Sequence, residues 1–282
     1  MPDATDAPDA PGGMTIDPIL PAGRGTRILA VANQKGGVGK TTTAINLGTA
    51  LAAINQQVLI IDLDPQGNAS TGLGIEPYNR KINSYNLLVD DSPLLDVVQT
   101  TEIPRLDIIP SGTDLYGAEI ELVDIERREY RLKDALIHAI GAYDYILIDC
   151  PPALGLLTIN ALVAAQAVLV PLQCEFYALE GISQLVKTVE HVRAAFNPTL
   201  EIQGIVLTMY DQRNNLSADV AADVREYFGD KVYNTVIPRN VRVSEAPSYG
   251  VPVLIYDMHC AGAQAYLALA GEIIHREREH AS

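Results

Sequence analysis

Short apolar runs alternate with amphipathic stretches along most of the chain. The apolar runs are rich in Val, Ile and Leu, which is typical of strands buried on both faces of a parallel sheet. They cover residues 28–31, 58–61, 106–109, 145–148, 167–170, 202–207 and 232–237. Helical periodicity fills the intervals, at residues 41–54, 115–123, 131–140, 156–165, 178–195, 218–227 and 262–276. The alternation predicts an α/β fold with a doubly wound, mostly parallel sheet and helices on both faces.

Two segments depart from this pattern. Residues 1–25 are rich in Pro, Gly, Ala and Asp, and such a segment buries too little apolar surface to offset the entropy lost on ordering. We therefore expect a disordered N-terminal tail, followed by a single domain over 26–282, which is close to the length that doubly wound domains reach. Residues 71–105 are less regular, and we expect an insertion or a mobile connection there.

The net charge limits how the protein could contact nucleic acid. Its 20 basic and 35 acidic residues give a formal charge of −15 and a pI near 4.6, so any contact with DNA requires a local basic patch. Three widely spaced cysteines form neither a disulfide framework nor a metal-binding motif. The chain has no apolar run of 18 residues and no basic, apolar leader, so we expect no membrane contact and a cytoplasmic location.

The strongest chemical signal is the sequence Q-K-G-G-V-G-K-T-T at 34–42, between a predicted strand and a predicted helix. Glycines let backbone N–H groups converge on phosphate oxygens, and the helix N-terminus adds a partial positive charge. In a phosphate-binding loop of this kind, Lys40 reaches the β and γ phosphates and the Thr41 hydroxyl binds Mg²⁺. The residues expected to bind a nucleotide are Lys35, Gly36, Gly37, Val38, Gly39, Lys40, Thr41 and Thr42.

Two carboxylate motifs stand at the ends of later strands. Asp62 and Asp64 follow the run at 58–61 and lie two residues apart, so in an extended strand both would face the same side. One of the two can serve the metal shell and the other can orient an attacking water. Asp149 ends the run at 145–148, and an apolar strand that delivers a carboxylate beside Mg²⁺ is a Walker B motif. All three carboxylates belong to the edge of the sheet where such folds bind ligands.

The loop resembles the deviant Walker A motif of the ParA/MinD family of ATPases. Its first position is Gln34 rather than the usual Gly, and a second lysine, Lys35, follows. The resemblance implies that Lys35 reaches across a dimer interface to the partner's nucleotide and that Asp64 supports hydrolysis. The catalytic residues are then Lys35, Lys40 and Asp64, and the metal residues are Thr41, Asp62 and Asp149.

Segments at 173–181, 207–211 and 236–247 are similar to ParA-type, Soj-like chromosome and plasmid partition proteins. The resemblance implies that Met209, Pro238 and Asn240 line the adenine pocket. It also implies that Arg213 and Arg242 bind DNA without sequence preference. Residues 187–242 carry seven basic and seven acidic side chains, so a DNA-binding patch requires a dimer that gathers arginines from both subunits.

The resemblance implies a Mg·ATP-dependent ATPase that forms a homodimer with ATP, binds double-stranded DNA on the nucleoid and drives partition with a ParB-type centromere-binding protein. A MinD-like cell-division ATPase is the first alternative, but residues 272–280 mix charges and lack the apolar face of a membrane helix. A nitrogenase-iron-protein-like electron carrier, with a [4Fe–4S] cluster on Cys150 and Cys174, is the second. A nucleotide-binding transcriptional regulator is the third, although we expect no DNA-binding domain ahead of the loop.

Overall fold

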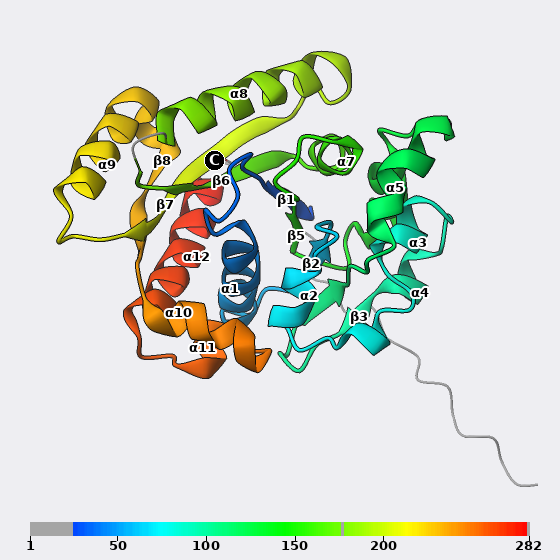
Figure 1. Cartoon of the computed structure of the whole chain (residues 1–282), viewed down its shortest axis with the longest axis horizontal. Helices are drawn as coiled ribbons and strands as arrows, with labels where there is room; N and C mark the ends of the chain where they lie inside the picture. The colour runs from blue at the N-terminus through cyan, green and yellow to red at the C-terminus, as the bar shows by residue number, and fades with distance from the viewer. Residues whose placement is uncertain (1–24, 176–177, 281–282) are drawn as a thin grey trace, which may run out of the picture.

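The computed structural model describes residues 25–175 and 178–280, so residues 1–24 of the predicted tail lie outside it. One sheet of eight strands crosses the described residues in the order β3-β4-β2-β5-β1-β6-β7-β8 (Figure 1). All neighbouring strands are parallel except β3 and β4, which are antiparallel. The strands are β1 (Arg27–Val31), β2 (Val58–Asp62), β3 (Gln99–Thr100), β4 (Leu106–Ile109), β5 (Tyr145–Asp149), β6 (Ala167–Gln173), β7 (Glu201–Tyr210) and β8 (Val232–Pro238).

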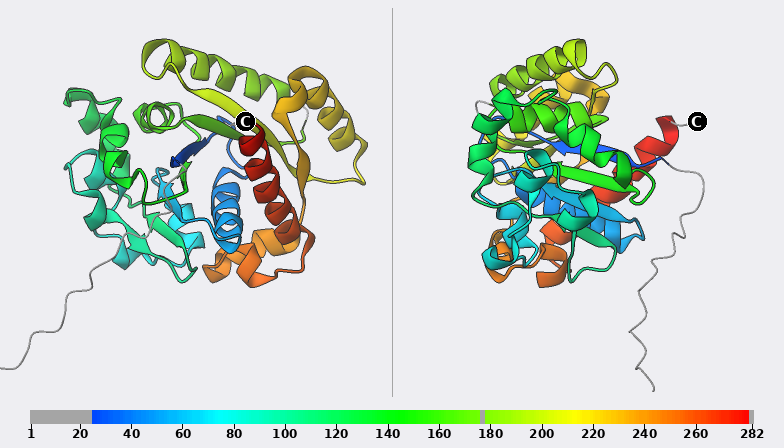
Figure 2. Two further views of the ribbon diagram at one scale, coloured as in Figure 1. Left: turned by 180° about the vertical axis from the view of Figure 1, so that it is seen from behind. Right: turned by 90° about the vertical axis from the view of Figure 1, so that its right-hand side faces the viewer.

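Helices cover both faces of this sheet (Figures 1 and 2). Those on one face are α1 (Lys40–Ala53), α2 (Asn68–Gly72), α10 (Val241–Glu245), α11 (Val253–Tyr256) and α12 (Ala261–His280). Those on the other face are α3 (Ser84–Leu88), α4 (Leu94–Val97), α5 (Leu115–Glu121), α6 (Arg131–Ala135), α7 (Leu156–Ala164), α8 (Ala178–Ala195) and α9 (Asn215–Phe228). Short 3₁₀ helices lie at Pro77–Asn79, Leu122–Asp124, Leu136–Ala139, Gly229–Lys231 and Ala246–Tyr249. The predicted doubly wound α/β fold is confirmed.

The central strands contribute alternate side chains to two separate apolar cores. In β1, Ile28 and Ala30 pack into the core beneath α3 to α9, whereas Leu29 and Val31 pack into the core beneath α1 and α12. A strand that is buried on both faces has no polar side, which explains why these strands appear in the sequence as continuous apolar runs.

The segment at 71–105 is more ordered than the expected insertion or mobile connection. It forms α3, α4 and β3, and β3 adds an antiparallel edge strand to β4. Asn83 caps α3 by accepting a hydrogen bond from the Tyr85 amide at 2.8 Å, and Leu87 and Leu88 are buried. The individual elements have only two to five residues, so they lack the long periodicity from which helices and strands are predicted.

Strand register brings the distant motifs together at the carboxyl edge of the sheet. Asp62 of β2 lies directly opposite Asp149 of β5, and Asp149 in turn lies opposite Val31 of β1. The loop at 34–39 begins three residues after Val31, where β1 ends. Since β1 lies between β5 and β6, the crevice where the strand order reverses opens beside this loop.

Candidate functional site

The glycine-rich loop adopts a conformation that its glycines make possible. Gly37 and Gly39 have φ angles of +74° and +88°, in the left-handed region that side chains disfavour. Gly39 precedes α1 as its N-cap, and Lys40 is the first helical residue. The backbone N–H groups at this helix start are therefore available to an anion, as the sequence predicts.

Lys40 is buried at the base of the loop. Only 7% of the residue is exposed, and its Nζ donates to the Lys35 carbonyl at 3.2 Å. Burial lowers the pKa of Lys40, and the nearby Asp149 carboxylate opposes that shift. A phosphate would supply the close anion that burial of this ammonium otherwise lacks.

Asp62 and Asp149 face each other in the register but differ in their hydrogen bonds. Asp62 accepts from the Ser70 amide at 2.8 Å and from the Ser70 hydroxyl at 2.7 Å. Within the described ranges, neither buried oxygen of Asp149 accepts a hydrogen bond of normal geometry, although Thr41 lies close enough to lower its pKa. Burial is the larger effect and raises the pKa of Asp149 well above its usual value, with Asp62 raising it further.

These oxygen donors suit a hard divalent cation such as Mg²⁺. Asp149 has two buried oxygens without hydrogen-bond partners among the described residues, and Thr41 brings a hydroxyl close to them. The same part of the chain contains no group of three or more His, Cys, Asp or Glu side chains arranged to hold a metal by themselves. Phosphate oxygens and water would complete the coordination, which is how Mg²⁺ commonly binds in nucleotide sites.

Asp64 lies beyond the strand, which differs from the expectation of one extended segment with Asp62. β2 ends at Asp62, and the Asp64 amide turns back to donate to Asp62 Oδ1 at 3.2 Å. Its own Oδ1 accepts from the Gln66 amide at 3.0 Å, and Asp64 is 7% exposed. The turn is fixed by Ser111, whose hydroxyl donates to the Asp64 carbonyl at 2.7 Å. Asp64 thus stands in a rigid turn beside the buried carboxylates.

Lys35 points to the end of β6 rather than into its own loop. Its Nζ pairs with Glu175 Oε2 at 2.5 Å, and 38% of the lysine side chain and 46% of the glutamate side chain are exposed. Gln173 donates to the other oxygen of the same carboxylate. The second lysine of the loop is therefore near the surface, ion-paired within its own subunit.

Met209, Pro238 and Asn240 come together at the carboxyl ends of β7 and β8. Tyr210 pairs with Pro238 across these strands, and Met209 has a φ of +50°, a conformation that is rare for a residue with a side chain. The neighbouring Thr208 hydroxyl donates to the Val38 carbonyl at 2.8 Å, which ties this end of β7 to the loop. The residues predicted to contact a base therefore lie beside the residues predicted to contact phosphate.

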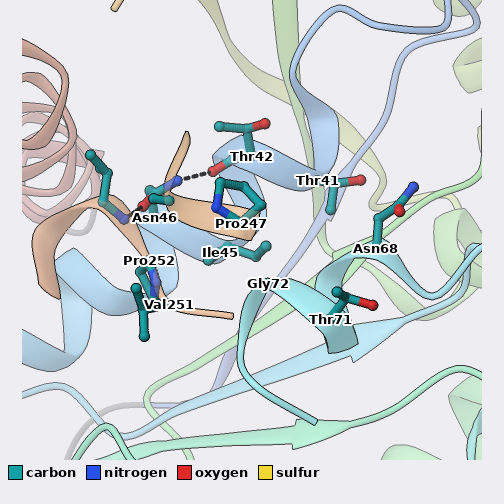
Figure 3. Close-up of a pocket in the computed structure, with 12 residues that line it drawn as sticks. Thr41, Thr42, Ile45, Asn46, Asn68, Thr71, Gly72, Pro247, Val251 and Pro252 are labelled. Atoms are coloured by element: carbon teal, nitrogen blue, oxygen red, sulfur yellow. Dashed lines mark hydrogen bonds between the residues drawn. The ribbon is translucent and has the colours of Figure 1, made fainter. Parts of the chain in front are cut away.

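A pocket of about 260 Å³ opens at the first turn of α1, between α2 and the segment at 246–253 (Figure 3). Thr41 and Thr42 line one side, while Asn68 and Thr71 of α2 line another. Asn46 donates to the Thr42 carbonyl at 2.8 Å and accepts from the Val253 amide at 2.8 Å, so it holds the 246–253 segment against α1. Neither Asn68 nor Asn46 was predicted from the sequence; Asn68 follows the Asp62–Gly67 motif directly, which is the signal that could have found it.

Arg213 and Arg242 lie on the surface near the ends of β7 and β8. The Arg213 side chain is 89% exposed and pairs with Asp211 at 3.0 Å. Arg242 pairs with Glu245 at 3.0 Å and with Asp257 at 3.6 Å. Arg239, which was not predicted from the sequence, is also exposed and forms no ion pair within the described ranges. The region therefore carries three arginines, but two of them already have acidic partners.

The site combines a strand, a phosphate-binding loop with a buried lysine, and a Walker B carboxylate on a neighbouring strand. These features define a P-loop nucleoside triphosphatase. A family model described as an AAA domain matches residues 26–202. The chain is 65% identical over 255 residues to the chromosome partitioning protein ParA of Caulobacter vibrioides NA1000, covering 90% of this chain and 96% of that protein. The chain belongs to the ParA-type family of chromosome partition ATPases.

Solved structures agree with this assignment. Cobyrinic acid a,c-diamide synthase of Mycobacterium smegmatis, with a bound ATP analogue and magnesium, is 38% identical with a TM-score of 0.79 and coverage of 90% and 96%. The cell-division ATPase MinD of Pyrococcus furiosus is 26% identical with a TM-score of 0.73 and coverage of 89% and 99%. The same fold therefore occurs in proteins that are named for different activities.

Proposed function

We propose that this ATPase binds Mg·ATP in the site at the end of β1, forms a homodimer in that state and then binds double-stranded DNA without sequence preference. A ParB-type protein would stimulate hydrolysis, so that the cycle drives partition of a chromosome or plasmid on the nucleoid. The single observation that carries the proposal is the loop with two lysines, Lys40 buried beside Asp149 and Lys35 near the surface.

Each part of the site has a distinct task in this proposal. The loop amides and Lys40 hold the phosphates, and Thr41 and Asp149 hold Mg²⁺, which supplies charge neutralisation at the reacting phosphate. Asp62 is already held by Ser70, so it supports the metal site through its charge. Asp64, fixed in its turn, orients the attacking water and accepts its proton. Met209, Pro238 and Asn240 take the adenine.

Lys35 must change partners before it can serve a second subunit. In this structure it pairs with Glu175 of the same chain. A lysine has three rotatable donors on a flexible stem, so it can move from a carboxylate to a nearby triphosphate at low cost. The greater negative charge of the partner's nucleotide would favour the exchange.

DNA binding is proposed for Arg213 and Arg242, each of which would appear twice in a symmetric dimer. Because both already pair with acidic side chains, they must leave those partners or share them to contact phosphates. Contacts to phosphates position a protein without reading bases, so binding would be indifferent to sequence. We propose that this ATPase acts as one domain over residues 26–282, in the cytoplasm and on the nucleoid.

The alternatives receive less support from the geometry. No helix in the described part of the chain is long and apolar enough to cross a membrane. The apolar side of α12 packs into the core through Tyr266, Leu269 and Ile273, so within the described residues this side is not free for a MinD-like membrane contact. Cys150 is fully buried and burial raises its thiol pKa, so its sulfur cannot face a second subunit to share a cluster.

The test is DNA binding by the purified full chain with ATP, with ADP and without nucleotide, on two unrelated duplexes. We expect tight binding with ATP alone and equal affinity for both duplexes. Equal binding in all three nucleotide states would overturn the proposed switch, and a strong preference for one duplex would overturn phosphate-only recognition.

A further inference from the structure

Helix α5 exposes an apolar stripe to solvent. Tyr116, Ile120 and Val123 have exposed fractions of 61%, 77% and 50%. Their spacing of four and three residues puts them on one side of α5 and of the 3₁₀ turn that extends it. The other side packs into the core through Leu115, Ala118 and Leu122. We call Tyr116, Ile120 and Val123 the α5 stripe.

The stripe lies in a strongly acidic part of the chain. Residues 114–126 contain no basic residue and five acidic ones, which are Asp114, Glu119, Glu121, Asp124 and Glu126. None of the ion pairs found among the described residues involves any of these five. Arg128 donates to the Val123 carbonyl at 2.8 Å and pairs with Glu129, so one cation lies at the end of the stripe. The five carboxylates of 114–126 have no ion pair among the described residues, so they complement a partner segment that is itself basic and partly apolar.

Glu119 connects this helix to the loop that follows the Walker B carboxylate. Its Oε1 is buried without a hydrogen-bond partner in the described part of the chain. The same oxygen lies against Gly155, so close that a Cβ placed on Gly155 would be 1.8 Å from it. Gly155 caps α7 and ends the loop that begins after Asp149. A displacement of Glu119 would therefore remove a packing contact between α5 and the end of this loop.

We infer that the α5 stripe receives a basic, partly apolar segment of the protein that stimulates hydrolysis. The inference rests on the proposed function and assigns that partner a contact surface. A cation from the partner would pair with Glu119 and draw its buried oxygen off Gly155, freeing the 150–155 loop next to the site. Leu154, the neighbour of Gly155 in the chain, is also apolar and 40% exposed. Glu119 acts here as a positioning residue.

The experiment compares Tyr116→Lys with Tyr227→Lys in the full chain. Tyr227 is 74% exposed on α9, at the opposite side of the molecule from α5 (Figure 1), so the two changes are matched in chemistry and exposure. ATP turnover is measured with DNA while a ParB-type protein encoded in the same genome is titrated in. ATP-dependent dimerisation and basal turnover are measured for each variant. Ile120→Lys and Glu119→Gln are tested in the same way.

We expect both stripe variants to keep basal turnover and dimerisation but to need about tenfold more partner for half-maximal stimulation, the loss typical of truncating one central interface residue. Tyr227→Lys should behave as the parent. Glu119→Gln, which keeps the shape and removes the charge, should lower maximal stimulation while basal turnover stays unchanged. Stimulation of the parent should weaken as salt rises, because the interface includes opposite charges.

Three outcomes would overturn the inference. Unchanged stimulation of Tyr116→Lys and Ile120→Lys would show that the partner docks elsewhere. Loss of ATP-dependent dimerisation in these variants would assign the stripe to the interface between two copies of this chain. If the parent itself is not stimulated, the proposed function loses its partner and this inference fails with it, whereas stimulation of parent and variants alike rejects the docking surface alone.

Discussion

Replacing Glu175 by Gln should strengthen ATP-dependent dimerisation, because it frees Lys35 from an ion pair within its own subunit. The paired side chains are 38% and 46% exposed, and exposed pairs of this kind contribute about 0.2–1 kcal/mol. The substitution then raises the equilibrium constant for a free Lys35 by about 1.4- to 5-fold per subunit. Since a symmetric dimer releases two such lysines, its association constant should rise by about 2- to 30-fold. Gln keeps the shape of the side chain and can still accept a hydrogen bond from Gln173.

The assay is light scattering or sedimentation with a slowly hydrolysed ATP analogue, at low and at high salt. The gain should shrink as salt increases, since salt screens the pair that the substitution removes. Glu190→Gln, an exposed glutamate on α8, is the matched control and should leave dimerisation unchanged. A dimer of Glu175→Gln that is as weak as the parent's, or weaker, would refute the view that this pair competes with the interaction between subunits.

Three further predictions concern the site and the surface. Lys40→Ala should abolish nucleotide binding, because the buried ammonium beside Asp149 has no substitute; calorimetric titration showing near-normal ATP affinity would remove Lys40 from the site. Asp64→Ala should keep ATP binding and lose hydrolysis, so that the dimer stays on DNA; turnover at the parent rate would reject its role in orienting water. Arg213→Glu with Arg242→Glu should leave ATP-dependent dimerisation intact and abolish DNA binding. Each arginine–phosphate interaction that is removed, twice per dimer, should reduce the magnitude of the log–log salt slope by about 0.9, and an unchanged slope would exclude these arginines.

The sequence by itself determined the fold class, the strands other than the short β3, and the candidate chemistry at their carboxyl ends. Continuous apolar runs alternating with helical periodicity predicted all the central strands, because a strand buried on both faces has no polar side to break the run. The loop at 34–42 and the carboxylates at the ends of β2 and β5 were equally visible. The loop and the strand-end carboxylates Asp62 and Asp149 are local patterns that residue type, spacing and the preceding strand make visible, whereas the turn that holds Asp64 was not predicted.

Only the tertiary structure decided which of these groups touch. Register places Asp62 opposite Asp149, and burial leaves Asp149 without hydrogen bonds among the described residues while Ser70 satisfies Asp62. The pairing of Lys35 with Glu175 and the packing of Glu119 against Gly155 join residues that are far apart in the chain. The turn at Asp64 lies outside any regular element. Such interactions depend on packing between elements, and no local spacing in the sequence encodes them.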